Sequence, residues 1–268
     1  MAIVHVTDLA AERRLDPYRA LKQTNDTARR GLLIAEGDKL VERLLSSGLK
    51  VESVLLGASF VDRFAPILPA GQPAFVVDDA ALRELVGYEF HRGILACGVR
   101  PASPTLAGLT TNLPHESMRQ TLVVCPDVQD PENLGAIVRI AAGFGAIGIL
   151  LGPRTADPFS RRVQRVSMGN VYELPIATSN DVAAALTSLR HEHGFESWGT
   201  VLDMDAETLG TRPRPERLAI VFGSEGHGIP PDVVAACDRK VIIPMRPGVD
   251  SLNVAVAAGI FLYELTKP

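Results

Sequence analysis

Four polar side chains stand among small and apolar residues in three separate stretches of the chain. Asn133 and Arg139 occur in NLGAIVR, just after an apolar stretch that is typical of a strand. Glu225 lies in the glycine-rich stretch GSEGHG after a second predicted strand, and Asn253 opens the apolar stretch 254–262. The carboxyl ends of parallel strands meet at one edge of a sheet, where ligands bind. We therefore expect these side chains to form one composite site that combines a carboxylate, amides and a cation.

Each of these residues also has a purely structural interpretation. Taken alone, Asn133 is favoured as a helix N-cap and Arg139 as a solvated helix residue. Ser251 is predicted to be the N-cap of the terminal helix, with Asn253 in its first turn. His227 stands between two glycines, and we do not assign it as a base, because we expect it to be exposed. The presence of three such loops at strand ends is what favours a shared site.

Residues 143–148 read GFGAIG and match a dinucleotide-binding fingerprint by their letters. That fingerprint needs a strand before it and a helix after it, because the phosphate lies on the amides that open the helix. Here the glycines follow a predicted helix and precede a strand, which is the reverse order. We interpret them as a helix C-cap and a turn.

Composition restricts the class of protein. Of the 268 residues, 46% are hydrophobic and 22% are charged, which is typical of a globular chain. The net charge of −4 argues against non-specific nucleic-acid binding but allows a local basic face. The three widely spaced cysteines indicate neither a metal site nor a disulfide framework. The N-terminus does not resemble a signal peptide, and Arg139 and glycines interrupt the longest apolar stretch, 136–152, so we expect a cytoplasmic protein without membrane spans.

Alternating helix and strand patterns indicate two α/β domains. Residues 1–100 predict a small α/β domain, residues 101–120 a linker rich in Pro, Ser, Thr and Asn, and residues 121–268 a parallel sheet buried on both faces. The expected strands span residues 32–35, 51–57, 74–77, 94–99, 122–125, 147–151, 171–176, 197–202, 218–222 and 241–243. Helices are expected, among others, over residues 16–30, 158–168 and 181–193.

Three stretches of the second domain resemble a known family. NLGAIVR, IVFGSEGHGI and IPMRPGVDSLNVAVAAGI look like the three signature motifs of the SpoU (TrmH-like) branch of the SPOUT RNA methyltransferases, in their expected order and spacing. In the first domain, LIAEGDKLVERLLSSG and YEFHRGILACGVR resemble the substrate-binding domain that often precedes them, whose fold is like that of small ribosomal RNA-binding proteins. Each motif alone is degenerate, but all five agree.

The resemblance implies a deep trefoil knot in the C-terminal segment, S-adenosylmethionine as cofactor, and a homodimer whose active site is shared by two chains. The apolar face of the terminal helix would then form the core of the interface. The positions that match the family's cofactor-binding residues are Leu202, Met204, Gly223, Ile243 and Leu252. The positions that match its catalytic residues are Arg139, Asn133, Glu225, Ser251 and Asn253.

The implied reaction transfers a methyl group from S-adenosylmethionine to a ribose 2′-hydroxyl of RNA. That hydroxyl is a poor nucleophile until its proton leaves. Arginine is so basic that its guanidinium is already protonated, so it cannot accept this proton. We therefore expect Arg139 to hold a target phosphate and to stabilise the 2′-oxyanion, while a phosphate oxygen or water takes the proton.

The RNA itself is expected to contact local basic clusters. The residues predicted for this role are Arg154, Arg161, Arg162, Arg165, Arg29 and Arg30. A solvated charged face is the alternative for such a run. The likeness of the first domain to ribosomal RNA-binding folds favours ribosomal RNA as the substrate over two alternatives, a tRNA 2′-O-methyltransferase and a catalytically inactive RNA-binding homologue. A housekeeping role and an antibiotic-resistance role both fit this prediction.

Overall fold

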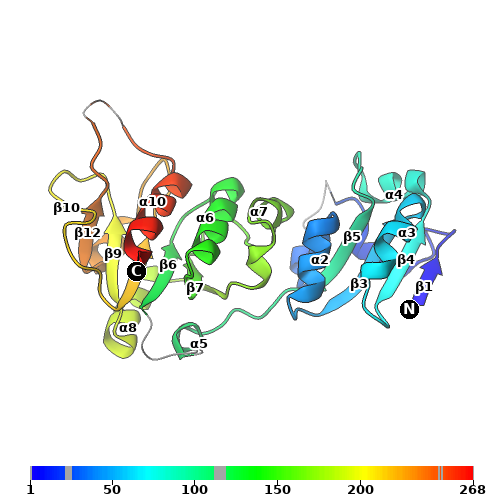
Figure 1. The fold of residues 1–268 in the computed structure, drawn as a ribbon, viewed down its shortest axis with the longest axis horizontal. Helices are drawn as coiled ribbons and strands as arrows, with labels where there is room; N and C mark the ends of the chain where they lie inside the picture. The colour runs from blue at the N-terminus through cyan, green and yellow to red at the C-terminus, as the bar shows by residue number, and fades with distance from the viewer. Residues whose placement is uncertain (1, 22–25, 112–118, 247, 249, 268) are drawn as a thin grey trace. The chain divides into compact units, whose positions relative to one another are not determined.

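The structure is a computed structural model that describes residues 2–21, 26–111, 119–246, 248 and 250–267 (Figure 1). The chain forms two compact units, each with its own sheet. The first unit comprises Met1–Ala102 and Phe159–Glu173, and the second comprises Ser103–Pro158 and Leu174–Pro268. The sequence pattern instead assigns residues 159–173 to the second domain. They lie in the first unit because their side chains contact strand and helix residues there, as described below.

The described residues of the first unit build a five-stranded sheet in the order β1-β4-β3-β5-β2. β1, β4 and β3 are mutually parallel, whereas β5 runs antiparallel to both β3 and β2. The strands are β1 (Ala2–His5), β2 (Leu32–Glu36), β3 (Val51–Gly57), β4 (Pro73–Val77) and β5 (Ile94–Val99). The α-helices are α1 (Asp26–Arg29), α2 (Asp38–Ser46), α3 (Val61–Phe64), α4 (Asp79–Val86) and α7 (Arg161–Val166), and the 3-10 helices are η1 (Arg13–Tyr18), η2 (Ala58–Phe60), η3 (Ala65–Ile67) and η4 (Asn170–Tyr172).

Helices pack on both faces of this sheet. On one face, Tyr18 of η1 and Leu82 of α4 pack against Leu55 and Leu95 of the strands. On the other face lies α2, because Leu44 packs against the glycine at position 98 in β5. The sheet is therefore buried on both sides, and the residues at its strand ends remain available for polar contacts.

The described residues of the second unit build a seven-stranded sheet in the order β10-β12-β9-β11-β6-β7-β8, and every neighbouring pair is parallel. The strands are β6 (Gln120–Cys125), β7 (Gly148–Leu151), β8 (Ile176–Thr178), β9 (Glu196–Thr200), β10 (Glu207–Thr208), β11 (Arg217–Val221) and β12 (Arg239–Ile242). The helices are α5 (Leu106–Thr111), α6 (Pro131–Gly143), α8 (Val182–His193), α9 (Pro231–Ala236) and α10 (Val254–Thr266). The prediction of a parallel sheet buried on both faces is confirmed.

The two faces of this second sheet are covered by different helices. Buried residues of α5, α8 and α9 pack together with strand residues in one core, while α6 and α10 contact each other elsewhere (Figure 1). Side-chain caps define the helix starts: Asp130 accepts the Glu132 N–H at the start of α6, and Asp181 accepts the Ala184 N–H at the start of α8. The two helices that begin near Asn133 and Asn253, α6 and α10, are neighbours.

Several expected elements differ from the observed ones. The expected linker contains α5, which packs Leu109 and the partly buried Leu106 against the core of the second unit. The polar composition around these two residues concealed the helix. Residues 112–118 lie outside the described residues. The expected strand 171–176 is replaced by η4 and a strand that begins at Ile176, because the buried Tyr172 hydroxyl hydrogen-bonds Gln164 Oε1 at 2.6 Å and fixes a turn there.

The N-terminal and central helix predictions also change. In the expected helix 16–30 the structure has η1 and the short α1, and residues 22–25 lie outside the described residues. Helix α7 is shorter than the expected 158–168, because Ser160 caps its start by accepting the Val163 N–H and Met168 has a positive φ of 54°. Among the described residues, no helix is long and apolar enough to cross a membrane.

Candidate active site

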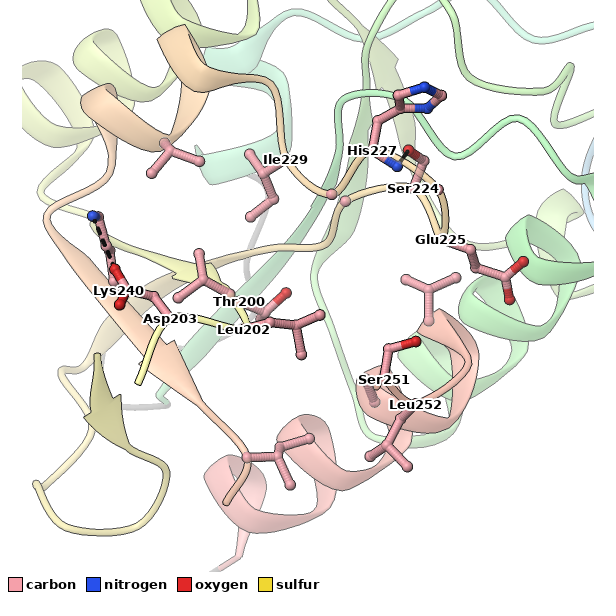
Figure 2. Close-up of a pocket in the computed structure, with 18 of the residues that line it drawn as sticks. Thr200, Leu202, Asp203, Ser224, Glu225, His227, Ile229, Lys240, Ser251 and Leu252 are labelled. Carbon is pink, nitrogen blue, oxygen red and sulfur yellow. Dashed lines mark hydrogen bonds and ion pairs between the residues drawn. The ribbon is translucent and has the colours of Figure 1, made fainter. Parts of the chain in front are cut away.

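A pocket of about 560 Å³ lies at the carboxyl edge of the second sheet, where β9, β11 and β12 end (Figure 2). Its walls come from residues 200–203, from the loop 223–229, and from the chain between β12 and the second turn of α10. These are neighbouring strands of one parallel sheet, so their carboxyl ends open onto the same space. The predicted meeting of the loops with Glu225 and Asn253 at one sheet edge is confirmed.

The lining of the pocket combines a largely apolar wall with a few polar side chains. Its apolar side chains are Val201, Leu202, Ile229, Val234, Ile243, Met245, Leu252, Val254, Ala257 and Phe261. Its polar side chains are Thr200, Asp203, Ser224, Glu225, His227, Lys240 and Ser251. Figure 2 shows Asp203 and Lys240 on one side and Glu225, Ser251 and Leu252 on the other. This combination is typical of a site for a small organic ligand.

The loop after β11 owes its shape to glycine. Ser224 and Gly228 exchange two backbone hydrogen bonds of 3.0 and 2.9 Å, which close a tight turn. A Cβ at Gly223 would lie 2.1 Å from the carbonyl carbon of Gly228, so a side chain at Gly223 would force the turn open. Glu225 and His227 are exposed within this turn, as the sequence predicts for His227.

Asn253 joins three distant stretches of the sequence. Its Nδ2 donates to Asn133 Oδ1 at 2.8 Å and to Glu225 Oε1 at 2.5 Å. Its Oδ1 accepts the backbone N–H groups of Ala255 and Val256 at 3.0 and 3.2 Å. The amide therefore caps α10 and also fixes the orientation of a carboxylate beside the pocket. We call Asn133, Glu225 and Asn253 the Asn253 cluster.

The two predicted N-caps are wrong. Asn253, not Ser251, caps α10, because its extended backbone (φ −53°, ψ 137°) directs Oδ1 at the first free N–H groups of the helix. Asp130, not Asn133, caps α6, which leaves the buried amide of Asn133 free to accept from Asn253. Ser251 is exposed and lines the pocket.

Arg139 lies apart from the Asn253 cluster. It is exposed on α6 and makes no hydrogen bond or ion pair with any residue that the structure describes. Arg139 follows Asn133 by six residues. This spacing turns the two side chains about 120° apart around a helix. The expected composite site thus forms without Arg139, which is exposed as the structural interpretation of this residue predicts.

The five positions that match the family's cofactor-binding residues do not behave alike. Leu202, Gly223, Ile243 and Leu252 line the pocket. Met204 does not line it, and its side chain is 86% exposed in a turn beyond β9. Within the loop that precedes Leu252, residues 247 and 249 lie outside the described residues.

The predicted RNA-binding arginines have different surroundings. In the second unit, Arg154 forms a 2.8 Å ion pair with the buried Asp127. In the first unit, Arg161 and Arg165 both lie against the buried Glu36. Arg29, Arg30 and Arg162 are exposed. Two members of the predicted basic run are therefore held by a carboxylate that the sequence did not single out.

Asp203 and Lys240 are pocket residues that the sequence patterns did not identify. Lys240 Nζ lies 3.5 Å from Asp203 Oδ2. The pKa of Asp203 is lowered by the backbone N–H of Asp205, with a smaller contribution from Lys240. Asp203 follows β9, so the same argument about the carboxyl ends of strands could have found it.

The cysteines are not suited to nucleophilic chemistry. Cys97, Cys125 and Cys237 are free thiols. Burial raises the pKa of each thiol to about 12, so all three remain protonated near neutral pH.

Comparison with known proteins supports the likeness carried by the three motifs. The SpoU rRNA Methylase family matches residues 120–263. An uncharacterised tRNA/rRNA methyltransferase of Mycobacterium tuberculosis is 33% identical over 266 residues, which cover 95% of this chain and 88% of that protein. The 23S rRNA (guanosine-2′-O-)-methyltransferase RlmB of Acinetobacter baylyi is 32% identical over 188 residues, which cover 70% of this chain and 75% of RlmB.

A solved structure extends this likeness to both units. The AdoMet-bound rRNA methyltransferase of Sinorhizobium meliloti matches with a TM-score of 0.79 and 28% identity, covering 98% of this chain and 97% of that one. The family model covers more than half of the chain, and the motifs that it includes meet at the Asn253 cluster. The chain belongs to the SpoU rRNA methylase family.

Proposed function

We propose that this protein is an S-adenosylmethionine-dependent methyltransferase that modifies a ribose 2′-hydroxyl of ribosomal RNA. The observation that carries the proposal is the Asn253 cluster beside an apolar pocket, since it joins three family motifs where a ligand can bind. The A. baylyi relative is named as a 23S rRNA 2′-O-methyltransferase, and the S. meliloti structure as an AdoMet-bound rRNA methyltransferase. Reaction, cofactor and substrate class follow from this combination.

The pocket fits S-adenosylmethionine. Its volume of about 560 Å³ lies within the usual range for small-ligand sites. Apolar walls suit the adenine ring and the carbon chain, and the carboxylate of Glu225 at the pocket complements a positively charged sulfonium. When bound, the cofactor supplies a methyl group that is activated by this sulfonium. Leu202, Gly223, Ile243 and Leu252 would hold the cofactor.

The side chains divide the remaining work. Asn253 holds one oxygen of Glu225, which leaves the other carboxylate oxygen to orient the ribose hydroxyl together with Ser251. Arg139 would hold the target phosphate and stabilise the developing 2′-oxyanion. The guanidinium cannot itself take the proton, so a phosphate oxygen or water takes it.

A second copy of the chain would complete this site. Val256, Ile260 and Tyr263 are exposed on α10, and Phe144 at the end of α6 packs edge-on against Tyr263. These four side chains form an apolar face that suits a homodimer interface. In such a dimer the exposed Arg139 would reach the cluster of the partner, which accounts for its separation from Asn133 in one copy.

Two finer features belong to the same proposal. The chain after β11 would be threaded into a deep trefoil knot. One support is that β12 lies between β9 and β10 in the sheet, and another is that the loops before and after β12 line the same pocket. The protein would reside in the cytoplasm, since its three free thiols suit a reducing compartment.

Methyl incorporation from labelled S-adenosylmethionine into deproteinised 23S rRNA, with bulk tRNA in parallel, tests the function. We expect incorporation into 23S rRNA at one ribose, and we expect that ribose to lack its 2′-O-methyl group in total RNA from cells without the gene. Incorporation into tRNA alone would redirect the substrate assignment. Cofactor binding without incorporation into either RNA would instead identify an inactive RNA-binding homologue.

A further inference from the structure

A buried carboxylate in the first unit is surrounded by three arginines. Glu36 lies at the end of β2, and its side chain is 8% exposed. Arg161 and Arg165 approach Glu36 Oε2 at 3.4 and 3.5 Å, and the Arg92 Nε lies 3.9 Å from Oε1. One carboxylate against three guanidiniums leaves a net formal charge of +2. We call these four residues the Glu36 cluster.

The fold fixes the two arginines of α7 in this position. Arg161 and Arg165 are four residues apart, so they share one face of the helix. At the far end of the segment, Arg43 of α2 donates to Met168 O at 2.6 Å and to Asn170 Oδ1 at 3.3 Å. Side chains about 125 residues away from Glu36 in the sequence are thereby held against it.

The three arginines differ in how much of each remains accessible. Arg161 is the most enclosed, at 27% exposed, and donates to Leu21 O at 2.7 Å and to the Tyr88 hydroxyl at 3.0 Å. Arg165 and Arg92 are 39% and 48% exposed. Arg161 is thus an internal brace, whereas Arg92 and Arg165 present part of their guanidinium groups to solvent.

The backbone beside Glu36 favours this arrangement. Gly37 has a φ of +92°, and a Cβ there would lie 2.8 Å from Cδ of Arg92. Glycine therefore permits Arg92 to lie across the start of α2.

The surplus of positive charge needs a reason. A single arginine would neutralise Glu36, and each further guanidinium adds repulsion and a desolvation cost. The whole chain carries a net charge of −4, so this cluster contrasts with its general charge balance. Guanidinium forks match the geometry of phosphate oxygens and bind them through paired, charge-assisted hydrogen bonds. The exposed edges of the Arg92 and Arg165 guanidiniums suit a phosphate of an extended nucleic-acid backbone that lies along the protein surface.

We propose that Arg92 and Arg165, braced by Arg161 and oriented by the buried Glu36, form a phosphate-binding site for the RNA backbone on the first unit. The proposal rests on the proposed function, because it takes RNA to be the substrate. Arg92 and Arg165 contact phosphate, and Glu36 is a positioning residue that never touches RNA.

Filter binding of deproteinised 23S rRNA over a series of KCl concentrations tests this site in the full chain. Arg92→Ala and Arg165→Ala should each weaken binding about 3- to 10-fold and lower the slope of log K against log salt by about 0.7 to 0.9, the value for one lost phosphate contact. Arg83→Ala is the matched control: Arg83 is an exposed arginine of α4 in the same unit, and its loss should leave the slope unchanged. Wild-type affinity and slope in both cluster variants would overturn the proposal.

Glu36→Gln distinguishes orientation from simple charge. The substitution raises the net charge by one, so an effect of charge alone would tighten RNA binding. If Glu36 orients the arginines, binding weakens instead. Arg165→Lys tests the geometry of the site should Glu36→Gln fail to fold, since it keeps the charge but loses the planar fork that Glu36 would orient. Tighter binding by Glu36→Gln, or unchanged binding by Arg165→Lys, would contradict the positioning role.

Cofactor binding and methyl incorporation by the same preparations separate this proposal from the proposed function. All cluster variants should bind S-adenosylmethionine like the wild type, because the pocket lies in the second unit. If the wild type methylates RNA and the variants bind RNA normally, the phosphate site alone is wrong. If the variants lose RNA binding and the wild type methylates no RNA, the phosphate site stands and the enzymatic function is wrong.

Discussion

Each unit of this protein places one glutamate at the centre of a polar cluster, and the partners of the two carboxylates differ. Glu225 is exposed and accepts from the neutral amide of Asn253. Glu36 is buried and faces three guanidiniums. Amide partners fix a carboxylate in space without cancelling its charge, so Glu225 can still act on a hydroxyl or a cation. Guanidinium partners more than cancel the charge, so the surroundings of Glu36 favour an added anion.

The two clusters therefore suit opposite halves of one task. The Asn253 cluster lies beside a pocket and, in our proposal, would offer negative charge to a sulfonium and a hydroxyl. The Glu36 cluster lies in the first unit and, in our proposal, would offer positive charge to RNA phosphates. Within one copy of the chain the Asn253 cluster contains no cation, and the exposed Arg139 is the source that we propose.

Arg139→Ala should give the largest effect and tests whether the Asn253 cluster needs an added cation. Methyl incorporation should fall by about 10³-fold, since a charge that stabilises the oxyanion is lost. The affinity for S-adenosylmethionine, measured by titration calorimetry, should remain nearly that of the wild type. Arg139→Lys keeps the charge and should retain part of the activity. Near-normal methylation by Arg139→Ala would show that the amides and Glu225 suffice.

Asn253→Asp asks whether a neutral partner is essential to Glu225. Aspartate is as good an N-cap as asparagine, so the melting temperature should stay close to that of the wild type. The variant loses the Nδ2 donor, however, and places a second carboxylate against Glu225. Turnover should fall about 10²-fold, the usual cost of misplacing a reacting group by about 1 Å. Asn253→Ser is the control, because serine is a neutral N-cap that also lacks the Nδ2 donor to Glu225. Wild-type turnover in both variants would show that Glu225 need not be held in place.

The sequence predicted the framework of both units well, because burial leaves a clear local pattern. Continuous apolar runs such as 122–125 and 218–222 match β6 and β11 closely, and the Asp181 cap with Gly194 defines α8. The pairing of Asn253 with Glu225 could be anticipated, since both loops follow strands of one parallel sheet. The residue that caps α10 could not be anticipated, because serine and asparagine are equally good N-caps by residue type.

The Glu36 cluster lay beyond prediction for a physical reason. Its helix α7 is only six residues long and belongs by sequence order to the second domain, so no local pattern indicates that it packs on β2. Arg161 and Arg165 read as a solvated basic run until Glu36, about 125 residues away, is known to lie beside them. Contacts of such separation depend on the tertiary fold and leave no periodic signal.

Ile260→Glu tests whether the Asn253 cluster, unlike the Glu36 cluster, needs a second copy. A charge on the apolar face of α10 should raise the dissociation constant of the dimer by roughly 30-fold, or about 2 kcal/mol. Methylation should fall with the fraction of dimer, while binding of 23S rRNA by the Glu36 cluster persists in each chain. Ile67→Glu is the matched control, since Ile67 is 36% exposed and Ile260 38%. Light scattering after gel filtration measures the mass, and a monomeric wild type would exclude the shared site.

Glu36→Gln and Asn253→Ala compare how much each cluster contributes to the free energy of unfolding. We expect these effects to be the smallest. Without Glu36, the three arginines repel one another, which should destabilise the first unit by about 1–2 kcal/mol at low salt. In 1 M KCl the Debye length falls to about 3 Å, so most of this loss should disappear. Asn253→Ala removes a neutral cap, which should destabilise the second unit by about 1 kcal/mol with little dependence on salt. Urea unfolding, whose denaturant carries no charge, measures both at low and high KCl. If the loss of unfolding free energy depended equally on salt in the two variants, the electrostatic contrast between the charged Glu36 cluster and the neutral cap at Asn253 would be wrong.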